Sequence, residues 1–306
     1  MPRAYGRRPP KNAPAVPFAA IHAAGVLPAF PPTYDSIAGW DGWQMLGNDS
    51  AGDCVSVTWA TIRRILTRGA TYPTLDQVIA LYRTQNPDFD PNGGSRTGPG
   101  SPADGGMDIQ TLLEYLVKTG GPDGVKAVAF AKVDHTNLDE VKAALATFRT
   151  LWLGVNVTDV NQQQFPDQPW TTAGYVEGGH SIAATGYDAA RVLMETWAAE
   201  ASLADSYMTT TGAARGGAGV EEAWVVIWPE HLAHLTADQL GALATAYTEV
   251  TGKPLVVPVP PAPAPVPTPP APVPTPTPNP GPDFNEVVEA LWARLVSEVK
   301  KFFNSL

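Results

Sequence analysis

Apolar residues recur every three or four positions through the first part of the central region, which is the period of helices with one buried face. At the end of one such stretch, 108–119, Gly120 and Gly121 follow the last apolar position, as is typical of a helix end. The pattern predicts four helices, at residues 55–66, 75–83, 108–119 and 138–148. Asn137 is the expected N-cap of the fourth.

Beyond residue 150 the pattern changes to short apolar runs that are rich in β-branched and aromatic residues and bounded by turn residues. Such runs are typical of strands. We expect strands at 151–157, 181–187, 192–197 and 223–228, and a closing helix at 236–251. Helices followed by strands favour the α+β class, with a helical half packed against an antiparallel sheet.

Composition divides the chain into four segments. Residues 1–36 form a basic, Pro-rich arm, and residues 37–252 have the composition of a globular domain. Residues 253–282 are dominated by proline, which predicts a polyproline II linker. Residues 283–306 predict an amphipathic helix that we expect to dock on a protein partner or to self-associate.

Charge and composition exclude several functions. The formal net charge of −10 disfavours nucleic acid as a partner. The single cysteine excludes an internal disulfide, and the histidines lack metal-ligand spacing, so we expect neither metal nor cofactor. No apolar run approaches the ~20 residues of a transmembrane segment. Prolines interrupt the N-terminal stretch, so we expect cytosolic synthesis without a Sec signal; release or association with a virus particle stays open.

The candidate chemistry centres on Cys54, which follows a Gly-containing turn and opens the first expected helix. A helix N-terminus favours a thiolate and also favours negative charge on a nearby substrate oxygen. A thiol nucleophile needs a base, and the base needs an orienting partner. His180 begins an expected strand and Glu195 lies near the end of the next, so two adjacent antiparallel strands would bring them together.

This ordered set of segments resembles the papain family of cysteine peptidases over residues 34–228. Residues 180–187 are similar to the family's histidine strand, and residues 150–155 to the strand that precedes it. The resemblance implies a papain-like fold with a substrate cleft between its two halves. It also implies Cys54 as nucleophile, His180 as base, Glu195 as the orienting group and Asn48 in the oxyanion hole. The substrate-binding residues would be Gly105, Gly106, Gly179 and Trp197.

Several residues depart from the family pattern. Asn48 stands where the family has glutamine, Asp53 puts a carboxylate beside the thiol, and Val55 replaces an aromatic residue. Glu195 stands in place of an asparagine. In the plainest interpretation, Cys54 is a small buried apolar residue, Asn48 caps a turn and Glu195 is a surface charge.

Two functions follow from this pattern. The first is a thiol hydrolase that cleaves peptide or isopeptide bonds, with a peptide or a peptidoglycan peptide as substrate. The alternative is a weakly active or inactive papain-fold binding or structural module, for example a phage-particle or assembly component tethered through its C-terminal helix. The cysteine, histidine and carboxylate together favour the enzyme, whereas the departures and the tether favour the module.

Overall fold

The computed structural model describes residues 4–21, 29–232, 236–252 and 254–255. These residues fall within one compact unit, Met1–Pro258. The expected terminal helix at 283–306, and all of the expected linker except residues 254 and 255, lie outside the described residues.

In the described part of the chain, eight strands form one sheet in the order β1-β3-β8-β4-β5-β6-β7, and β2 pairs with β5. All pairings are antiparallel except that of β1 with β3. The strands are β1 (Val16–Pro17), β2 (Tyr34–Asp35), β3 (Ala129–Lys132), β4 (Leu151–Thr158), β5 (Val176–Tyr187), β6 (Arg191–Thr196), β7 (Ala199–Ala204) and β8 (Gly219–Ile227).

The predicted helices are confirmed, with small shifts at their ends. They are α1 (Cys54–Leu66), α2 (Leu75–Tyr82), α4 (Ile109–Lys118), α5 (Leu138–Phe148) and α9 (Ala237–Thr251). Asn137 caps α5, and its side chain accepts hydrogen bonds from the amides of Asp139 and Glu140. Shorter helical segments are η1 (Phe18–Ile21), α3 (Gly94–Thr97), α6 (Asp159–Gln164), α7 (Asp205–Thr209), η3 (Ala213–Arg215) and α8 (Pro229–Leu232). None of the described helices is both long and apolar enough to cross a membrane.

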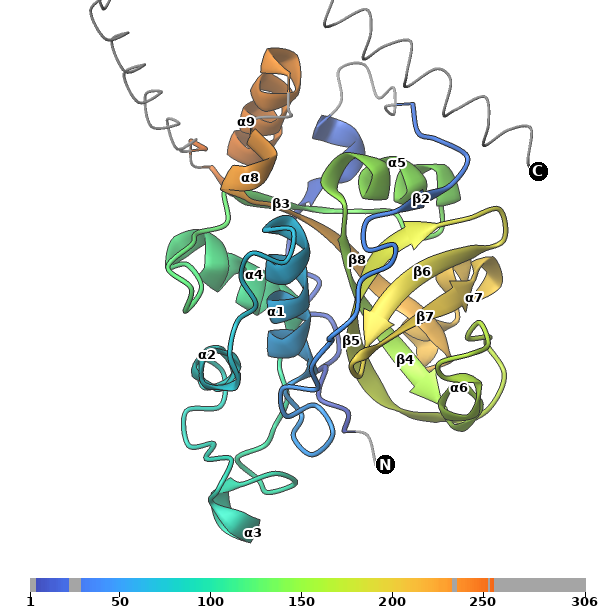
Figure 1. Cartoon of the computed structure of the whole chain (residues 1–306). Helices are drawn as coiled ribbons and strands as arrows, with labels where there is room; N and C mark the ends of the chain where they lie inside the picture. The colour runs from blue at the N-terminus through green and yellow to red at the C-terminus, as the bar shows by residue number, and fades with distance from the viewer. Residues whose placement is uncertain (1–3, 22–28, 233–235, 253, 256–306) are drawn as a thin grey trace, which may run out of the picture. The chain divides into compact units, whose positions relative to one another are not determined.

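The central strands are buried on both faces. In β4, Leu151, Leu153 and Val155 belong to one hydrophobic core, whereas Trp152 belongs to the other. The core around Trp152 is shared with α1, α2 and α4, and the opposite core is shared with α5 and α7. Figure 1 shows these helix groups on either side of the long strands. The α+β architecture predicted from sequence, a helical portion against a mostly antiparallel sheet, is therefore confirmed.

Four strands were not predicted from the sequence pattern: the two-residue strands β1 and β2, and also β3 and β7; two further strands are longer than expected. β3 and β7 are rich in alanine, which is a weak strand former, so neither gives a clear apolar run. β5 begins at Val176 rather than at residue 181, and β8 begins at Gly219 rather than at residue 223. Both extensions contain glycine and glutamate, which strands usually lack, and these polar extensions line the candidate site.

Candidate active site

Cys54 is the first residue of α1, and its side chain is fully buried. Burial raises the pKa of the Cys54 thiol to about 12. The backbones of Ser181, on β5, and of Gly6, near the N-terminus, lower this pKa together with the charge of Arg7, but they offset only part of the rise. The thiol is therefore protonated at neutral pH in this arrangement, and nucleophilic chemistry requires it to become accessible to water.

His180 immediately precedes Ser181 on β5 and is fully buried. Its Nε2 lies 2.7 Å from Oγ1 of Thr196. The imidazole stacks on the indole of Trp197, with ring centroids 4.3 Å apart and an interplanar angle of 20°. The ring plane and one nitrogen are thereby fixed, as a general base would require.

Glu195 lies on the opposite face of β6 from Thr196. It pairs in register with Ala183, whose side chain belongs to the core around α1. Thr61 of α1 donates a hydrogen bond to Glu195 at 2.8 Å, and burial raises the pKa of the Glu195 carboxyl to about 7. Successive residues of a strand point to opposite faces. The contact with the His180 ring that the sequence assigned to Glu195 is therefore made here by Thr196.

The loop before α1 holds two of the residues that depart from the family pattern. Asn48 is buried, and its backbone carbonyl accepts a hydrogen bond from the amide of Ala4 at 3.4 Å. Among the described residues, no group hydrogen-bonds to Asn48 Oδ1. Asp53 is also buried, and burial, followed by the nearby charge of Asp104, raises the pKa of the Asp53 carboxyl well above its usual value. The carboxyl beside Cys54 therefore favours its neutral form.

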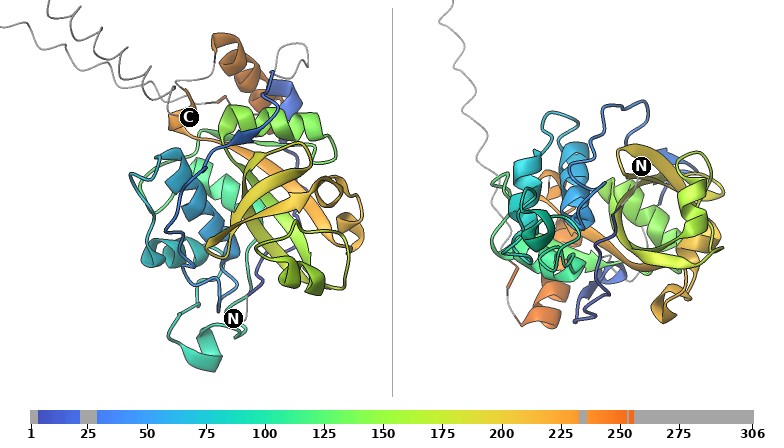
Figure 2. Two further views of the ribbon diagram at one scale, coloured as in Figure 1. Left: turned by 45° about the vertical axis from the view of Figure 1, so that its right-hand side comes forward. Right: turned by 90° about the horizontal axis from the view of Figure 1, so that it is seen from below.

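Residues 4–13 are the part of the N-terminal segment that lies at the site, and the name arm is kept for them from here on. They run between the two sides of the predicted substrate cleft, which are here called its walls. The amides of Gly6 and Arg7 donate to the carbonyl of Gly179 at 3.2 and 3.0 Å. On the other wall, the amide of Met107 donates to the carbonyl of Gly6 at 2.7 Å. Seen from below, the dark-blue N-terminal segment lies between the helices and the sheet (Figure 2). Both walls thus bind an extended polypeptide through its backbone.

The predicted substrate-binding glycines all line the arm. The carbonyl of Gly105 accepts a hydrogen bond from Nε of Arg8 at 2.9 Å. A Cβ at Gly106, which has φ +70°, or at Gly179 would overlap carbonyl oxygens of the arm. Only glycine at these two positions leaves room for a peptide backbone to approach so closely.

Trp197, the fourth predicted substrate-binding residue, also faces the arm. The ring of Tyr5 meets Trp197 and His180 edge-on, with centroid distances of 6.3 and 6.4 Å. The Tyr5 hydroxyl donates to Glu177 at 2.6 Å and accepts a hydrogen bond from Gln162. Tyr5 therefore covers the indole and the imidazole, a role that its position in a Pro-rich segment does not indicate.

A polar chain that sequence analysis missed joins α1 to the sheet. The indole of Trp152 donates to Ser181 Oγ at 2.8 Å, and Ser181 donates to Thr58 at 2.9 Å. Thr58 in turn donates to the backbone carbonyl of Cys54 at 2.9 Å. Hydroxyl residues inside the apolar segments around Thr58 and Ser181 are the signal that could have indicated this chain. It fixes the first turn of α1, and hence Cys54, against β5.

The described residues contain no cluster of three or more histidine, cysteine or carboxylate side chains that could hold a metal ion. The chemical groups of the site are the thiol of Cys54, the imidazole of His180, the hydroxyl of Thr196 and the backbone amides at the start of α1. These groups are suited to nucleophilic attack on a carbonyl with proton transfer by the imidazole.

No protein-family model and no curated protein matches the chain. Structural neighbours are papain-like cysteine proteases, the class that the sequence resembles. Xylellain, a cysteine protease from Xylella fastidiosa, is 17% identical with a TM-score of 0.48, over 74% of this chain and 96% of that one. The proform of the ragweed pollen allergen Amb a 11 is 15% identical with a TM-score of 0.47, over 71% of each chain. The cysteine protease CMS1MS2 of Carica candamarcensis, in complex with E-64, is 14% identical with a TM-score of 0.46, over 64% of this chain and 98% of that one.

Proposed function

We propose that this protein is a thiol hydrolase of the cysteine peptidase type that cleaves peptide bonds in extended polypeptides. The observation that carries the proposal is the way the arm is bound. An extended chain lies between the two walls, is held through its own backbone by Gly179 and Met107, and presents Gly6 to the only thiol. A surface that binds a peptide backbone beside a cysteine at a helix N-terminus suits peptide substrates.

In the proposed reaction the Cys54 thiol loses its proton to His180 and its sulfur attacks the carbonyl carbon of the substrate. The amides at the start of α1 stabilise the negative charge that develops on the carbonyl oxygen. His180 then donates the proton to the leaving amine as the C–N bond breaks. Water hydrolyses the resulting thioester and regenerates the thiol. Thr196 and Trp197 hold the imidazole throughout.

The arm must leave before a substrate can bind, because it fills the same surface. Its departure would also let water reach Cys54, which removes the main cause of the raised pKa of the thiol. The arm-bound structure is thus a closed form of the proposed enzyme. A binding or structural module is the second candidate, and the observation that favours it is this same burial of the thiol.

The pH dependence of Cys54 alkylation by iodoacetamide tests the proposed pair. Cys54 is the only cysteine, so mass spectrometry of the intact chain reports its modification directly. The measured rate is the product of the arm-opening equilibrium and the reactivity of the exposed thiol. We expect wild-type reactivity to persist below pH 7, as for a thiolate paired with an imidazole, and His180→Gln to lose that low-pH reactivity.

His135→Gln is the matched control, because the ring of His135, which is partly buried, contacts the backbone carbonyl of Met208. Circular dichroism spectra of both variants verify that they are folded. A rate that rises steadily toward the pKa of an ordinary thiol, about 8.5, in wild type and His180→Gln alike would refute the catalytic pair. The binding-module function would then be the better explanation.

A further inference from the structure

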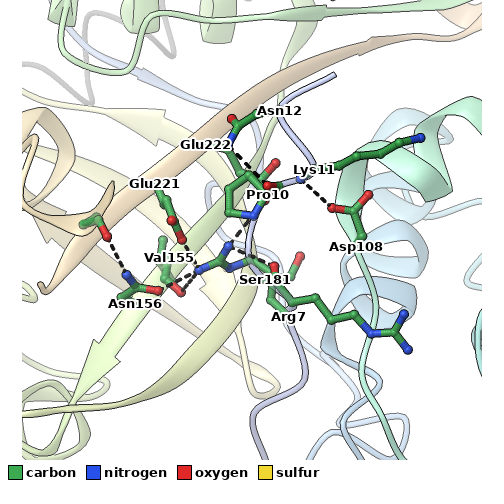
Figure 3. Close-up of polar contacts among 12 residues, drawn as sticks. Arg7, Pro10, Lys11, Asn12, Asp108, Val155, Asn156, Ser181, Glu221 and Glu222 are labelled. Atoms are coloured by element: carbon green, nitrogen blue, oxygen red, sulfur yellow. Dashed lines mark hydrogen bonds and ion pairs between the residues drawn. The ribbon is translucent and has the colours of Figure 1, made fainter. Parts of the chain in front are cut away.

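The side chain of Arg7 occupies a pocket built by β4 and β8 (Figure 3). Its Nη2 donates to Oδ1 of Asn156 at 2.6 Å and to Oε2 of Glu221 at 2.7 Å. The same nitrogen lies 3.4 Å from the carbonyl oxygen of Val155, and Nη1 lies 3.5 Å from Oε1 of Glu222. Only 2% of the Arg7 side chain is exposed. An arginine from one end of the chain is therefore enclosed by acceptors from the sheet.

The walls of this pocket are held by bonds that do not involve the arm. The Nδ2 of Asn156 donates to the carbonyls of Ala213 and Gly217, both at 3.1 Å. Oε2 of Glu222 accepts a hydrogen bond from the indole of Trp224 at 2.8 Å. Residues fixed in this way keep their acceptors aimed at the pocket when the arm is absent.

The pocket also has the shape and the charge of an arginine site. A Cβ at Gly154 would lie 2.7 Å from Cδ of Arg7, so this glycine makes room for the arginine stem. The Glu222 side chain is fully buried and that of Glu221 is 16% exposed. Buried carboxylates are costly without a cation, and a planar guanidinium can satisfy several acceptors at once. An apolar or anionic side chain would leave these acceptors unpaired.

The pocket adjoins the reactive centre and is open on one side. Arg7 follows Gly6, whose backbone is near enough to the Cys54 thiol to lower the pKa of that thiol. A surface cavity of about 380 Å³ lies beside Arg7 and is lined by Asn156, Glu177, Gly179 and Glu221, among others. A ligand can therefore enter the pocket from the surface, one residue away from the thiol.

We propose that Asn156, Glu221 and Glu222 form a subsite that binds an arginine side chain of the substrate peptide, and that the chain's own Arg7 occupies it in the closed form. This inference rests on the proposed function and specifies its substrate class as peptides that present arginine next to the scissile region. The acidic pocket would then select arginine over neutral side chains of equal size.

Chemical rescue of Arg7→Ala in the full chain tests the subsite without requiring catalysis. This variant leaves a hole of the shape of the arginine side chain, which N-acetyl-arginine amide can fill. N-acetyl-citrulline amide is the matched probe, because citrulline has nearly the same shape and no charge. At about ten times its dissociation constant, we expect the arginine compound to raise the melting temperature of Arg7→Ala by about 3 °C. The citrulline compound should raise it by less than 1 °C.

The wild-type chain, whose pocket is filled, should show no shift with either compound. Adding Glu221→Gln and Glu222→Gln together to Arg7→Ala should abolish the difference between the two compounds, because both carboxylates contact the guanidinium. If Arg7→Ala does not fold, Arg7→Gln is used in the same assay, because its shorter side chain also leaves the carboxylates unpaired. Equal shifts with both compounds, or no shift with either, would overturn the subsite. A wild-type alkylation rate that follows an ordinary thiol and does not change in His180→Gln, with the rescue intact, would refute only the peptidase.

Discussion

The two residues at the end of β6 illustrate how strand geometry assigns roles. Thr196 faces His180, whereas Glu195 faces Thr61 on α1. A neutral hydroxyl beside the imidazole can fix the ring, but it stabilises an imidazolium less than a carboxylate does. The carboxylate instead lies in an apolar core, which raises the pKa of Glu195 to about 7.

Glu195→Gln should flatten the pH dependence of stability. The pKa of Glu195 is higher in the folded chain than its ordinary value of 4.5, so the folded state binds more protons between these two values. The wild-type free energy of unfolding therefore falls as the pH rises from about 5 to 8. We expect the variant to remove about 1–3 kcal/mol of that fall, measured by urea unfolding at both pH values. Glu114→Gln on the exposed surface of α4 is the control, and an unchanged slope in Glu195→Gln would contradict the burial effect.

The sequence predicts where the candidate residues lie in the fold, but it does not predict how they contact one another. Cys54 and His180 follow from a turn before a helix and from a glycine pair before a strand. It could not be predicted that Thr196 rather than Glu195 faces His180, because a shift of one position in a strand reverses the face of every side chain. The arginine pocket left one visible trace, which is two adjacent glutamates within the apolar strand β8.

The tight connection between β6 and β7 shows the same limit for an element. Trp197 and Ala198 form this turn with φ values of +47° and +60°, in the left-handed region. Two-residue hairpins of this kind usually contain asparagine and glycine, so the pair Trp-Ala does not predict one. This unusual turn and the alanine-rich composition of β7 together explain why the sequence pattern predicts no strand directly after residue 197. The strained turn holds the indole of Trp197 against His180.

Ala198→Gly should stabilise the fold by relieving this strain. Glycine adopts positive φ without the Cβ penalty, which costs about 1 kcal/mol for other residues. We expect the free energy of urea unfolding to rise by about 0.5–1 kcal/mol. Ala190→Gly, in the neighbouring turn between β5 and β6 and outside the positive-φ residues, should instead destabilise the fold by a similar amount. If both variants lost stability equally, the turn at Ala198 would not be strained.

The arm determines whether the candidate site is accessible, because it occupies the surface between the two walls and closes it. The proline content and the charge of residues 1–36 distinguish them from the globular region. The sequence does not show where these residues bind, because the hydrogen bonds of the arm to Gly179 and Met107 involve only backbone groups. The packing of a helical portion against an antiparallel sheet, by contrast, could be predicted, because segments with helical apolar periodicity precede the short apolar strands.

Gly6→Ala should open the closed form. A Cβ at Gly6 would overlap the backbone carbonyl of Gly52 in the loop before Cys54, so the arm cannot keep its position. Water then reaches the thiol, its pKa falls from about 12 toward the ordinary value, and iodoacetamide gains access. We expect the rate of Cys54 alkylation at pH 8 to rise at least about tenfold, because such closing contacts amount to one or more kcal/mol.

Gly241→Ala on α9 is the matched control for this change, because a Cβ there meets no atom within 4 Å. It should leave the alkylation rate unchanged. An unchanged rate in Gly6→Ala as well would mean that Cys54 is buried by the core rather than by the arm. The raised pKa would then be a permanent property of the thiol, and the fold would be acting as a binding module. A selective rise in Gly6→Ala would instead show that ten residues at the start of the chain decide whether the site can react.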